Sequence, residues 1–228
     1  MKFIPEKELH NSPVVANCRM NRSRQLTGIN SYDKEIGIDI GRYLKDKIDQ
    51  NGGVSWLDIC CGEGNALLDV QEKLSNVRGY SEINLTGIDL VGMFNAANEP
   101  STVRLIESPI EVWEPQDRFD LITCIHGLHY IGDKLSLLTK IPNWLKNDGV
   151  FYGNLDLENI RDESNQSLGK SLKASWKKVR WAYQSRRRML RIDGDLNWPT
   201  NWKYVGADDQ AGPNYTGQEA VNSYYSIE

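Results

Sequence analysis

The sequence has 228 residues, of which 39% are hydrophobic and 25% are charged, and its formal net charge at pH 7 is −4. These proportions are those of a globular protein with a buried core, and they exclude fibrous and intrinsically disordered chains. The acidic balance disfavours nucleic-acid binding, which usually relies on a basic surface. No apolar run approaches the roughly 20 residues that cross a membrane as a helix.

The first residues and the cysteines indicate a cytoplasmic protein. The chain starts MKFIPEKE, without the apolar stretch and small-residue cleavage site of a secretory signal. Its cysteines show neither a disulfide framework nor the paired spacing of a zinc site. They are Cys18, Cys60, Cys61 and Cys124. We therefore expect reduced thiols, no metal and a cytoplasmic location.

Apolar periodicity predicts alternating helices and strands from residue 31 onward. Ser31 caps a helix whose apolar positions run from Ile36 to Ile48, and Asn51-Gly52-Gly53 ends it. Strands are then expected at 54–60, 83–90, 103–106, 119–125 and 150–157, and helices at 66–74, 94–98 and 134–146. Strands that alternate with helices imply a mostly parallel sheet covered on both faces.

The composition changes after residue 158. Between Lys170 and Arg191 there are nine basic residues and no acidic one. Apolar residues at helical spacing predict one amphipathic helix there, with a basic outer face. This face is either solvated or binds an anionic group, and Arg186-Arg187-Arg188 is the place for such a group. Two last strands, 202–207 and 220–227, should pair antiparallel because their connection is too short for a helical crossover.

The whole chain is predicted to form one α/β domain. We expect an N-terminal helical cap over residues 1–53, a cofactor-binding core over 54–157, a helical substrate lid over 158–201 and the final strands over 202–228. The predicted architecture is a Rossmann-like three-layer sandwich. It has a seven-strand-type, mostly parallel sheet, helices on both faces and an antiparallel C-terminal strand.

Two strand ends carry the residues that indicate a function. In WLDICCGEGN, residues 56–65, a strand ends at a carboxylate and a glycine turn follows. Gly62 and Gly64 lack Cβ, so the backbone can bend sharply and a ligand can lie against it. In GIDL, residues 87–90, a second strand ends at Asp89, whose carboxylate can accept both hydroxyl hydrogens of a ribose. Ligands of such sheets bind beyond the carboxyl ends of the strands.

Residues 54–157 resemble the class I, Rossmann-type methyltransferases that use S-adenosylmethionine (SAM). In that family the first strand typically ends in an acidic residue and a turn such as DxGCGTG. The resemblance rests on this turn, on Asp89 25 residues after Gly64, on FDLI at 119–122 and on NDGVF at 147–151, in this order. It implies that Asp89 holds the ribose and Leu90 packs on the adenine. The implied cofactor residues are Asp58, Cys60, Gly62, Gly64, Asp89, Leu90, Ser108, Ile110, Cys124 and Ile125.

Two positions depart from the family pattern. Cys60 stands where the first glycine usually does, so we expect a negative φ there. Ser108 stands where relatives often have an acidic residue that contacts the adenine amino group.

The segment DLITCIHGLHY, residues 120–130, resembles the part of the family that faces the methyl donor and the acceptor. His126 and His129 are the predicted catalytic residues, since imidazole titrates near neutral pH and can act as a general base. The alternative is that both histidines only pack and hydrogen-bond. Cys124 lies within a predicted buried strand, which favours a core thiol over a nucleophile.

In relatives, the N-terminal helices and the segment before the last strands form a lid over the acceptor. By this resemblance Asn21, Arg22, Tyr32 and Asp33 close over the cofactor. The polar loop 208–218 adds carboxylates, an amide and a phenol near the cleft. The residues predicted to contact the acceptor are Tyr32, His126, Tyr130, Arg187, Asp208 and Tyr215.

The sequence therefore predicts a SAM-dependent methyltransferase that acts on a small molecule such as a natural product and releases S-adenosylhomocysteine (SAH). Methylation of oxygen or nitrogen is favoured, and the acceptor is expected to be polar or anionic. Methylation of a protein or RNA, or a non-catalytic regulatory role, stays open. A dinucleotide-dependent oxidoreductase would need GxGxxG, which this turn lacks. We expect no membrane partner, and the pattern leaves the oligomeric state open.

Overall fold

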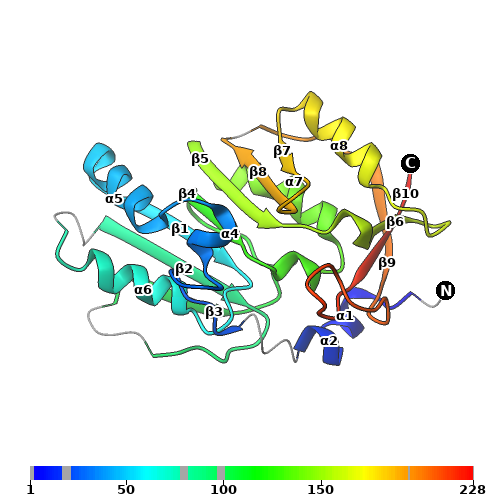
Figure 1. The fold of residues 1–228 in the computed structure, drawn as a ribbon, viewed down its shortest axis with the longest axis horizontal. Helices are drawn as coiled ribbons and strands as arrows, with labels where there is room; N and C mark the ends of the chain where they lie inside the picture. Colours follow the sequence, from blue (N-terminus) through cyan, green and yellow to red (C-terminus); the bar gives the residue numbers. More distant parts are fainter. Residues whose placement is uncertain (1–2, 17–21, 78–81, 97–100, 195, 228) are drawn as a thin grey trace.

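Seven strands form a central sheet in the order β3-β2-β1-β4-β5-β8-β7 (Figure 1). The parallel strands are β1 (Val54–Ile59), β2 (Ile83–Asp89), β3 (Val103–Glu107), β4 (Phe119–Cys124) and β5 (Leu145–Asn154). β8 (Met189–Asp193) runs antiparallel to β5, and β7 (Ala182–Gln184) antiparallel to β8. The predicted mostly parallel, Rossmann-like sheet is confirmed. The computed structural model describes residues 3–16, 22–77, 82–96, 101–194 and 196–227.

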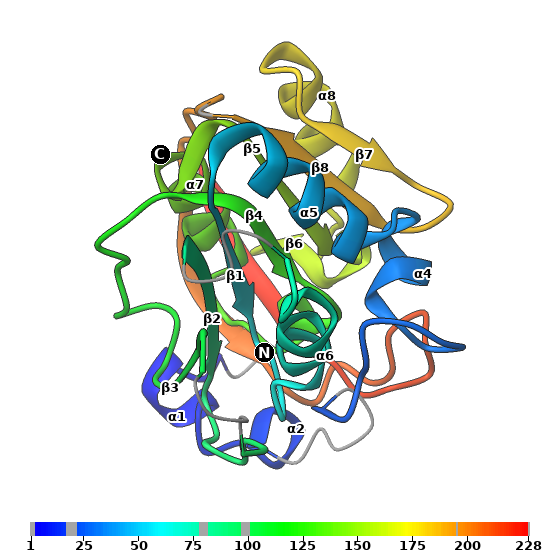
Figure 2. The same cartoon turned by 90° about the vertical axis from the view of Figure 1, so that its left-hand side faces the viewer.

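Helices cover both faces of this sheet (Figure 2). On one face lie α4 (Tyr32–Ile36), α5 (Ile40–Asn51) and α6 (Asn65–Leu74), and on the other lies α7 (Lys134–Trp144). The short helices α1 (Glu6–Leu9) and α2 (Pro13–Ala16) precede them, η2 (Gly127–His129) follows β4, and η3 (Leu157–Asn159) and α8 (Gly169–Lys178) follow β5. None of the described helices has the length and hydropathy to span a membrane.

A second sheet of three strands packs against α7. Its order is β6 (Ile160–Asp162), β10 (Asn222–Ile227) and β9 (Trp202–Asp208), and β9 and β10 pair antiparallel as predicted. The C-terminal strands therefore form a sheet of their own, while β7 and β8 supply the antiparallel edge of the main sheet. The backbone N–H of Leu135 donates to the Tyr225 hydroxyl at 3.0 Å, which ties the second sheet to the start of α7.

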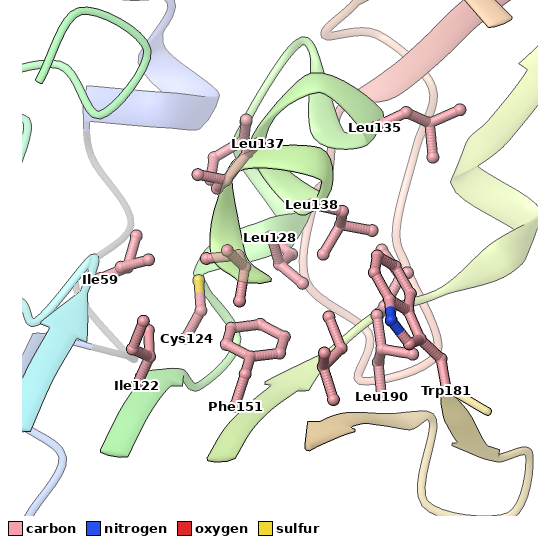
Figure 3. Packing of buried hydrophobic residues seen from close by; sticks show 14 of the residues in the cluster. Ile59, Ile122, Cys124, Leu128, Leu135, Leu137, Leu138, Phe151, Trp181 and Leu190 are labelled. Atoms are coloured by element: carbon pink, nitrogen blue, oxygen red, sulfur yellow. The ribbon is translucent and has the colours of Figure 1, made fainter. Parts of the chain in front are cut away.

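The two core layers follow from the alternation of side chains along the strands. Every residue of β1 is buried, as expected for a parallel strand covered on both sides. Trp56 packs with α5 and α6, whereas Leu57 and Ile59 pack with α7. Figure 3 shows the second layer, in which Phe151 of β5 points toward Leu128 of η2. Each such large apolar side chain contributes roughly 1.5–3 kcal/mol by burial.

Lys134 fixes the loop that follows β4. It is fully buried, and its ammonium donates to the carbonyls of Ile131 and Val221 and to the Ser223 hydroxyl at 2.7–2.9 Å. Burial lowers the pKa of Lys134 to about 7. Because these acceptors come from both the η2–α7 connection and β10, the second sheet holds η2 in place.

The expected helix from residue 31 to 48 is two helices. Gly37 has φ +85°, in the left-handed region, and its N–H donates to the Asp33 carbonyl, which ends α4. A new helix begins after Asp39, whose carboxylate accepts the N–H of Arg42. Only glycine enters this conformation without a steric cost, so Gly37 sets the break. The short helix expected at 94–98 is also wrong in its described part, since 94–96 form a loop and the rest lies outside the described residues.

The basic segment is only partly helical. α8 ends at Lys178, Arg180 has φ +62°, and the chain then forms the hairpin of β7 and β8. The helix expected up to Arg191 is therefore wrong beyond residue 178. In β8, Leu190 and Ile192 are fully buried and alternate with exposed residues, which is a strand pattern that the run of basic residues obscures.

Candidate active site

A cleft opens at the carboxyl ends of β1, β2 and β4. One wall carries the carboxylate of Asp89 and the backbone of Gly62, and the opposite walls are largely apolar. The cofactor residues from the sequence analysis that line the cleft are Cys60, Gly62, Asp89, Leu90, Ser108, Ile110 and Ile125. Of the predicted acceptor residues, His126 and Tyr130 also line it.

Three residues of the turn after β1 have a left-handed backbone: Cys60, Gly62 and Gly64. Cys60 has φ +58°, so the expectation of a negative φ there is wrong. A non-glycine residue in this region costs roughly 1–2 kcal/mol, and here it lets the chain reverse directly after β1. Gly62 has φ +61°, and a Cβ on it would lie 2.5 Å from the carbonyl oxygen of Arg22. Glycine is therefore required at 62 by both conformation and space.

Asp89 is the best-connected polar group of the cleft. Its Oδ2 accepts the N–H of Gly62 at 2.9 Å, and its Oδ1 accepts from the N–H of Val91 at 3.0 Å and from Nη1 of Arg22 at 3.1 Å. The carboxylate is thus held at the end of β2 with Arg22 lying over it. Arg22 belongs to the segment expected to close over the cofactor, whereas Asn21 and Cys18 lie outside the described residues.

His126 and Glu35 form a pair beside the cleft. Nε2 of His126 lies 3.2 Å from Oε1 of Glu35, and the backbone N–H of His126 donates to Oδ1 of Asn154 at 3.3 Å. His126 has φ +60°, which turns its side chain out of the line of β4. The imidazole, together with the nearby Arg24 guanidinium, lowers the pKa of Glu35. Glu35 is therefore a carboxylate at neutral pH.

His129 lies behind His126, and their ring centroids are 5.8 Å apart. It is fully buried, and this burial lowers the pKa of its imidazole well below the usual 6.5. The Tyr215 ring lies 5.6 Å from the His129 ring, and Cζ of Arg188 lies 4.3 Å from the centroid of Tyr215. Arg188 also pairs with Asp156. His129 is thus a neutral imidazole enclosed by a polar cluster.

A sequence model of the family described as methyltransferase domain matches residues 31–197, well over half of the chain. The chain belongs to this family. It is also 28% identical over 122 residues to the ubiquinone biosynthesis O-methyltransferase of Actinobacillus pleuropneumoniae serotype 7 (strain AP76). That match covers 48% of this chain and 49% of the relative.

Two solved structures are similar to this methyltransferase domain. One is the plantazolicin methyltransferase BpumL in complex with a monoazolic desmethyl analogue and SAH, at 20% identity and a TM-score of 0.40, covering 65% of this chain and 51% of that one. The other is coclaurine N-methyltransferase bound to N-methylheliamine and SAH, at 21% identity and a TM-score of 0.40, covering 67% and 45%. This chain spans about half the length of the relatives it matches.

Three predicted cofactor residues of the methyltransferase do not line the cleft. Asp58 is fully buried on the α4 side of β1, where its carboxyl accepts from the Tyr32 hydroxyl at 2.7 Å and from Oγ1 of Thr123 at 2.6 Å. Gly64 starts α6 with φ +80°, and a Cβ there would lie 3.0 Å from Leu105. Cys124 is fully buried in β4. The structure gives these residues supporting positions around the turn.

Several residues that were predicted to contact the acceptor also lie away from the cleft. The Tyr32 hydroxyl is buried against Asp58, and the exposed Arg187 donates to the Ile36 carbonyl at 3.5 Å. Asp208 accepts the N–H of Gln210 within its own turn at 2.9 Å. Tyr215 alone of these loop and lid residues joins the cluster at His129. Sequence reasoning named Arg188 only within the arginine run as a place for an anionic group, and it missed Glu35, Asn154 and Asp156.

The described residues contain one cluster with the donor set of a metal site. Ligand atoms of Glu6, His10 and Glu111 lie within 4.8 Å of one another, and His10 faces Glu111 at 3.4 Å. Burial and the neighbouring Glu111 raise the pKa of Glu6. A proton on this carboxyl can therefore balance the pair of acids without an ion.

The buried carboxyl of Asp58 should make stability depend on pH. Burial raises its pKa to about 7 from 3.8, so between about pH 4 and pH 7 the folded chain holds a proton that the unfolded chain has released. The free energy of unfolding should therefore fall as the pH rises through this window, by on the order of 2–4 kcal/mol from this group. Asp58→Asn cannot titrate and should flatten that slope in denaturant unfolding measured across the window.

The exposed carboxylate of Asp117 gives the matched control for this measurement. Asp117→Asn should keep the wild-type slope. Parallel slopes for wild type and Asp58→Asn would contradict the raised pKa of Asp58.

Proposed function

We propose that this protein is a SAM-dependent methyltransferase that acts on a small-molecule acceptor and releases SAH. The observation that carries the proposal is the carboxylate of Asp89, held at the end of β2 and facing an apolar cleft, in a chain that belongs to the methyltransferase domain family. The relatives described above support the same reading, because one is an O-methyltransferase and two were solved with SAH.

The residues of the cleft fit a nucleoside cofactor that carries no phosphate. The carboxylate of Asp89 offers its remaining acceptor capacity, on Oδ2, to the ribose, and Leu90 and Ile110 offer an apolar surface for the adenine. Arg22 lines the cleft, but its guanidinium already pairs with Asp89. A pyrophosphate would want several free backbone N–H groups, and the N–H of Gly62 is used by Asp89. When bound, the cofactor supplies a methyl group on a sulfonium, which is a good leaving group.

His126 and Glu35 give the site a general base. Nε2 of His126 lies 3.2 Å from the ionised Glu35, and this negative charge favours the neutral tautomer with its proton on Nε2 and its lone pair on Nδ1. Nδ1 is buried and has no hydrogen-bond partner, and His126 lines the cleft. An acceptor hydroxyl placed there can give its proton to Nδ1 while its oxygen attacks. Glu35 orients the ring in this scheme and is a positioning residue.

The basic residues of segment 170–191 lie away from the cleft, which favours a small acceptor over a polyanionic macromolecule. The basic side chains of α8 do not line the cleft. Arg187 is exposed and donates to the Ile36 carbonyl, and Arg188 pairs with Asp156. The basic segment therefore offers no continuous surface that leads a polyanion to His126.

The ribose assignment predicts the effect of Asp89→Asn on cofactor binding. Asparagine keeps an oxygen for the N–H of Gly62 but loses the charge, and its NH2 replaces Oδ1, which accepts from Val91 and Arg22. The Kd for SAM, measured by titration calorimetry, should rise about 10–100-fold, since hydrogen bonds to charged groups contribute about 1.5–3 kcal/mol. Asp193→Asn, which changes an exposed carboxylate of β8, should bind as wild type does. An Asp89→Asn affinity within twofold of wild type would remove the ribose assignment.

The base assignment predicts a specific tautomer. In ¹⁵N-histidine NMR the neutral imidazole of His126 should carry its proton on Nε2, and Glu35→Ala should remove this preference. The chain has three histidines, so His126→Asn identifies the resonance, and asparagine tolerates the left-handed backbone at 126. A neutral His126 with its proton on Nδ1 would show that this nitrogen cannot act as the base.

A further inference from the structure

Five buried nitrogen atoms without a hydrogen bond lie close together beside the cleft. They are both ring nitrogens of His126 and of His129 and Nδ2 of Asn154, and among them Nε2 of His126 faces Glu35 at 3.2 Å. The side chains of His129 and Asn154 are fully buried. Nearly all buried polar groups of folded proteins are hydrogen-bonded, so a set of unpartnered ones at one place indicates a polar ligand.

The three side chains come from adjoining elements at the carboxyl ends of β4 and β5. Oδ1 of Asn154 accepts the backbone N–H of His126 at 3.3 Å, so the amide is anchored by its oxygen. The side chains of Glu35 and Tyr215 are polar neighbours of this amide, which acts to lower the pKa of both, but its nitrogen reaches full hydrogen-bond geometry with neither. The free donor is therefore next to the imidazole proposed to deprotonate the acceptor.

Tyr215 and Arg188 cover this cluster from outside. The Tyr215 ring lies 5.6 Å from the ring of His129 and 6.4 Å from that of His126, and it is 39% exposed. Tyr215 lies in the loop between β9 and β10, and the Arg188 guanidinium stacks on the face of its ring. The Tyr215 ring therefore lies between the two histidines and solvent, and its contact with Arg188 is a cation–π interaction.

The charges around the cluster are already balanced. Glu35 faces His126 at 3.2 Å and Arg24 at 3.5 Å, and Asp156 pairs with Arg188. A protonated amine that entered here would meet uncharged nitrogens and carboxylates that already face a partner. A neutral oxygen would instead meet N–H donors that lack an acceptor.

We propose that Asn154 and His129 form a subsite for a second oxygen of the acceptor, and that the methylated atom is a hydroxyl oxygen and not an amine nitrogen. This inference rests on the proposed function. The Asn154 amide donates to the second oxygen, a carbonyl or hydroxyl, and the His129 imidazole donates or accepts as that oxygen requires. The acceptor hydroxyl gives its proton to Nδ1 of His126. Its oxygen bonds to the methyl carbon as the carbon–sulfur bond breaks, and that electron pair stays on sulfur.

Three small probes test the subsite on the full chain saturated with SAH. 1,2-Dihydroxybenzene carries two neighbouring oxygens, phenol carries one, and benzylamine carries a cationic amine. Ligand-observed NMR titration to about 20 mM gives each Kd, a range that includes weak fragment binding. We expect 1,2-dihydroxybenzene to bind about tenfold more tightly than either of the other two, because it alone can use both Asn154 and His126.

Asn154→Asp then exchanges the donor for an acceptor. It keeps the oxygen that receives the N–H of His126 and replaces the amide nitrogen with a second oxygen. The affinity for 1,2-dihydroxybenzene should fall about tenfold, and that for benzylamine should rise. Asn147→Asp makes the same chemical change at an exposed position of the same strand and should alter neither affinity.

The affinity for SAH, measured on each protein, distinguishes a failure of the proposed function from a failure of the subsite. If the wild-type chain does not bind SAH, the proposed function fails. If SAH binds normally, three results overturn the subsite alone. These are no detectable binding of 1,2-dihydroxybenzene, benzylamine binding at least as tightly, or an unchanged 1,2-dihydroxybenzene affinity in Asn154→Asp.

Discussion

The carboxylate of Asp89 accepts the backbone N–H of Gly62 at 2.9 Å, and this bond joins the end of β2 to the turn that follows β1. The turn itself depends on left-handed residues, one of which is a cysteine that tolerates the conformation only at a cost. Because β1 lies in the middle of a sheet that is buried on both faces, the turn cannot shift without disturbing both core layers. The rigid sheet thus fixes the place where a ligand can meet the backbone.

The neighbouring strands β4 and β5 of the same sheet position the polar side chains beside the cleft. β4 ends at the segment that carries His126, and β5 ends at Asn154, whose amide oxygen accepts the backbone N–H of His126 beside the cleft. Glu35 comes from α4, and its carboxylate lies 3.2 Å from the imidazole of His126. The second sheet covers these side chains from outside, because the loop between β9 and β10 carries Tyr215. Lys134, at the start of α7, bonds to the chain next to β10 and so holds this sheet close to η2. Buried polar groups without a hydrogen bond lie beside the cleft, a free-energy cost that a binding site can tolerate when a ligand removes it.

The sequence is sufficient for the parallel part of the sheet, because each parallel strand is an apolar run that ends in a turn residue and is followed by a helical pattern. It also predicts Asp89 and the glycine turn, since their spacing along the chain is local. It does not predict Glu35 or Asn154 as site residues, because charged and amide side chains are common on surfaces and only the fold brings these two together. The β7–β8 hairpin is hidden for a related reason. Its buried residues are few, and the basic residues around them match a helix face equally well.

The most direct test of the central claim is titration calorimetry of the purified chain with SAM and SAH, with NAD as the comparison. The geometry of the cleft predicts saturable binding of SAM and SAH and no binding of NAD, since the turn lacks the free N–H groups that a pyrophosphate needs. Binding of NAD, or the failure of both SAM and SAH to bind, would contradict the account.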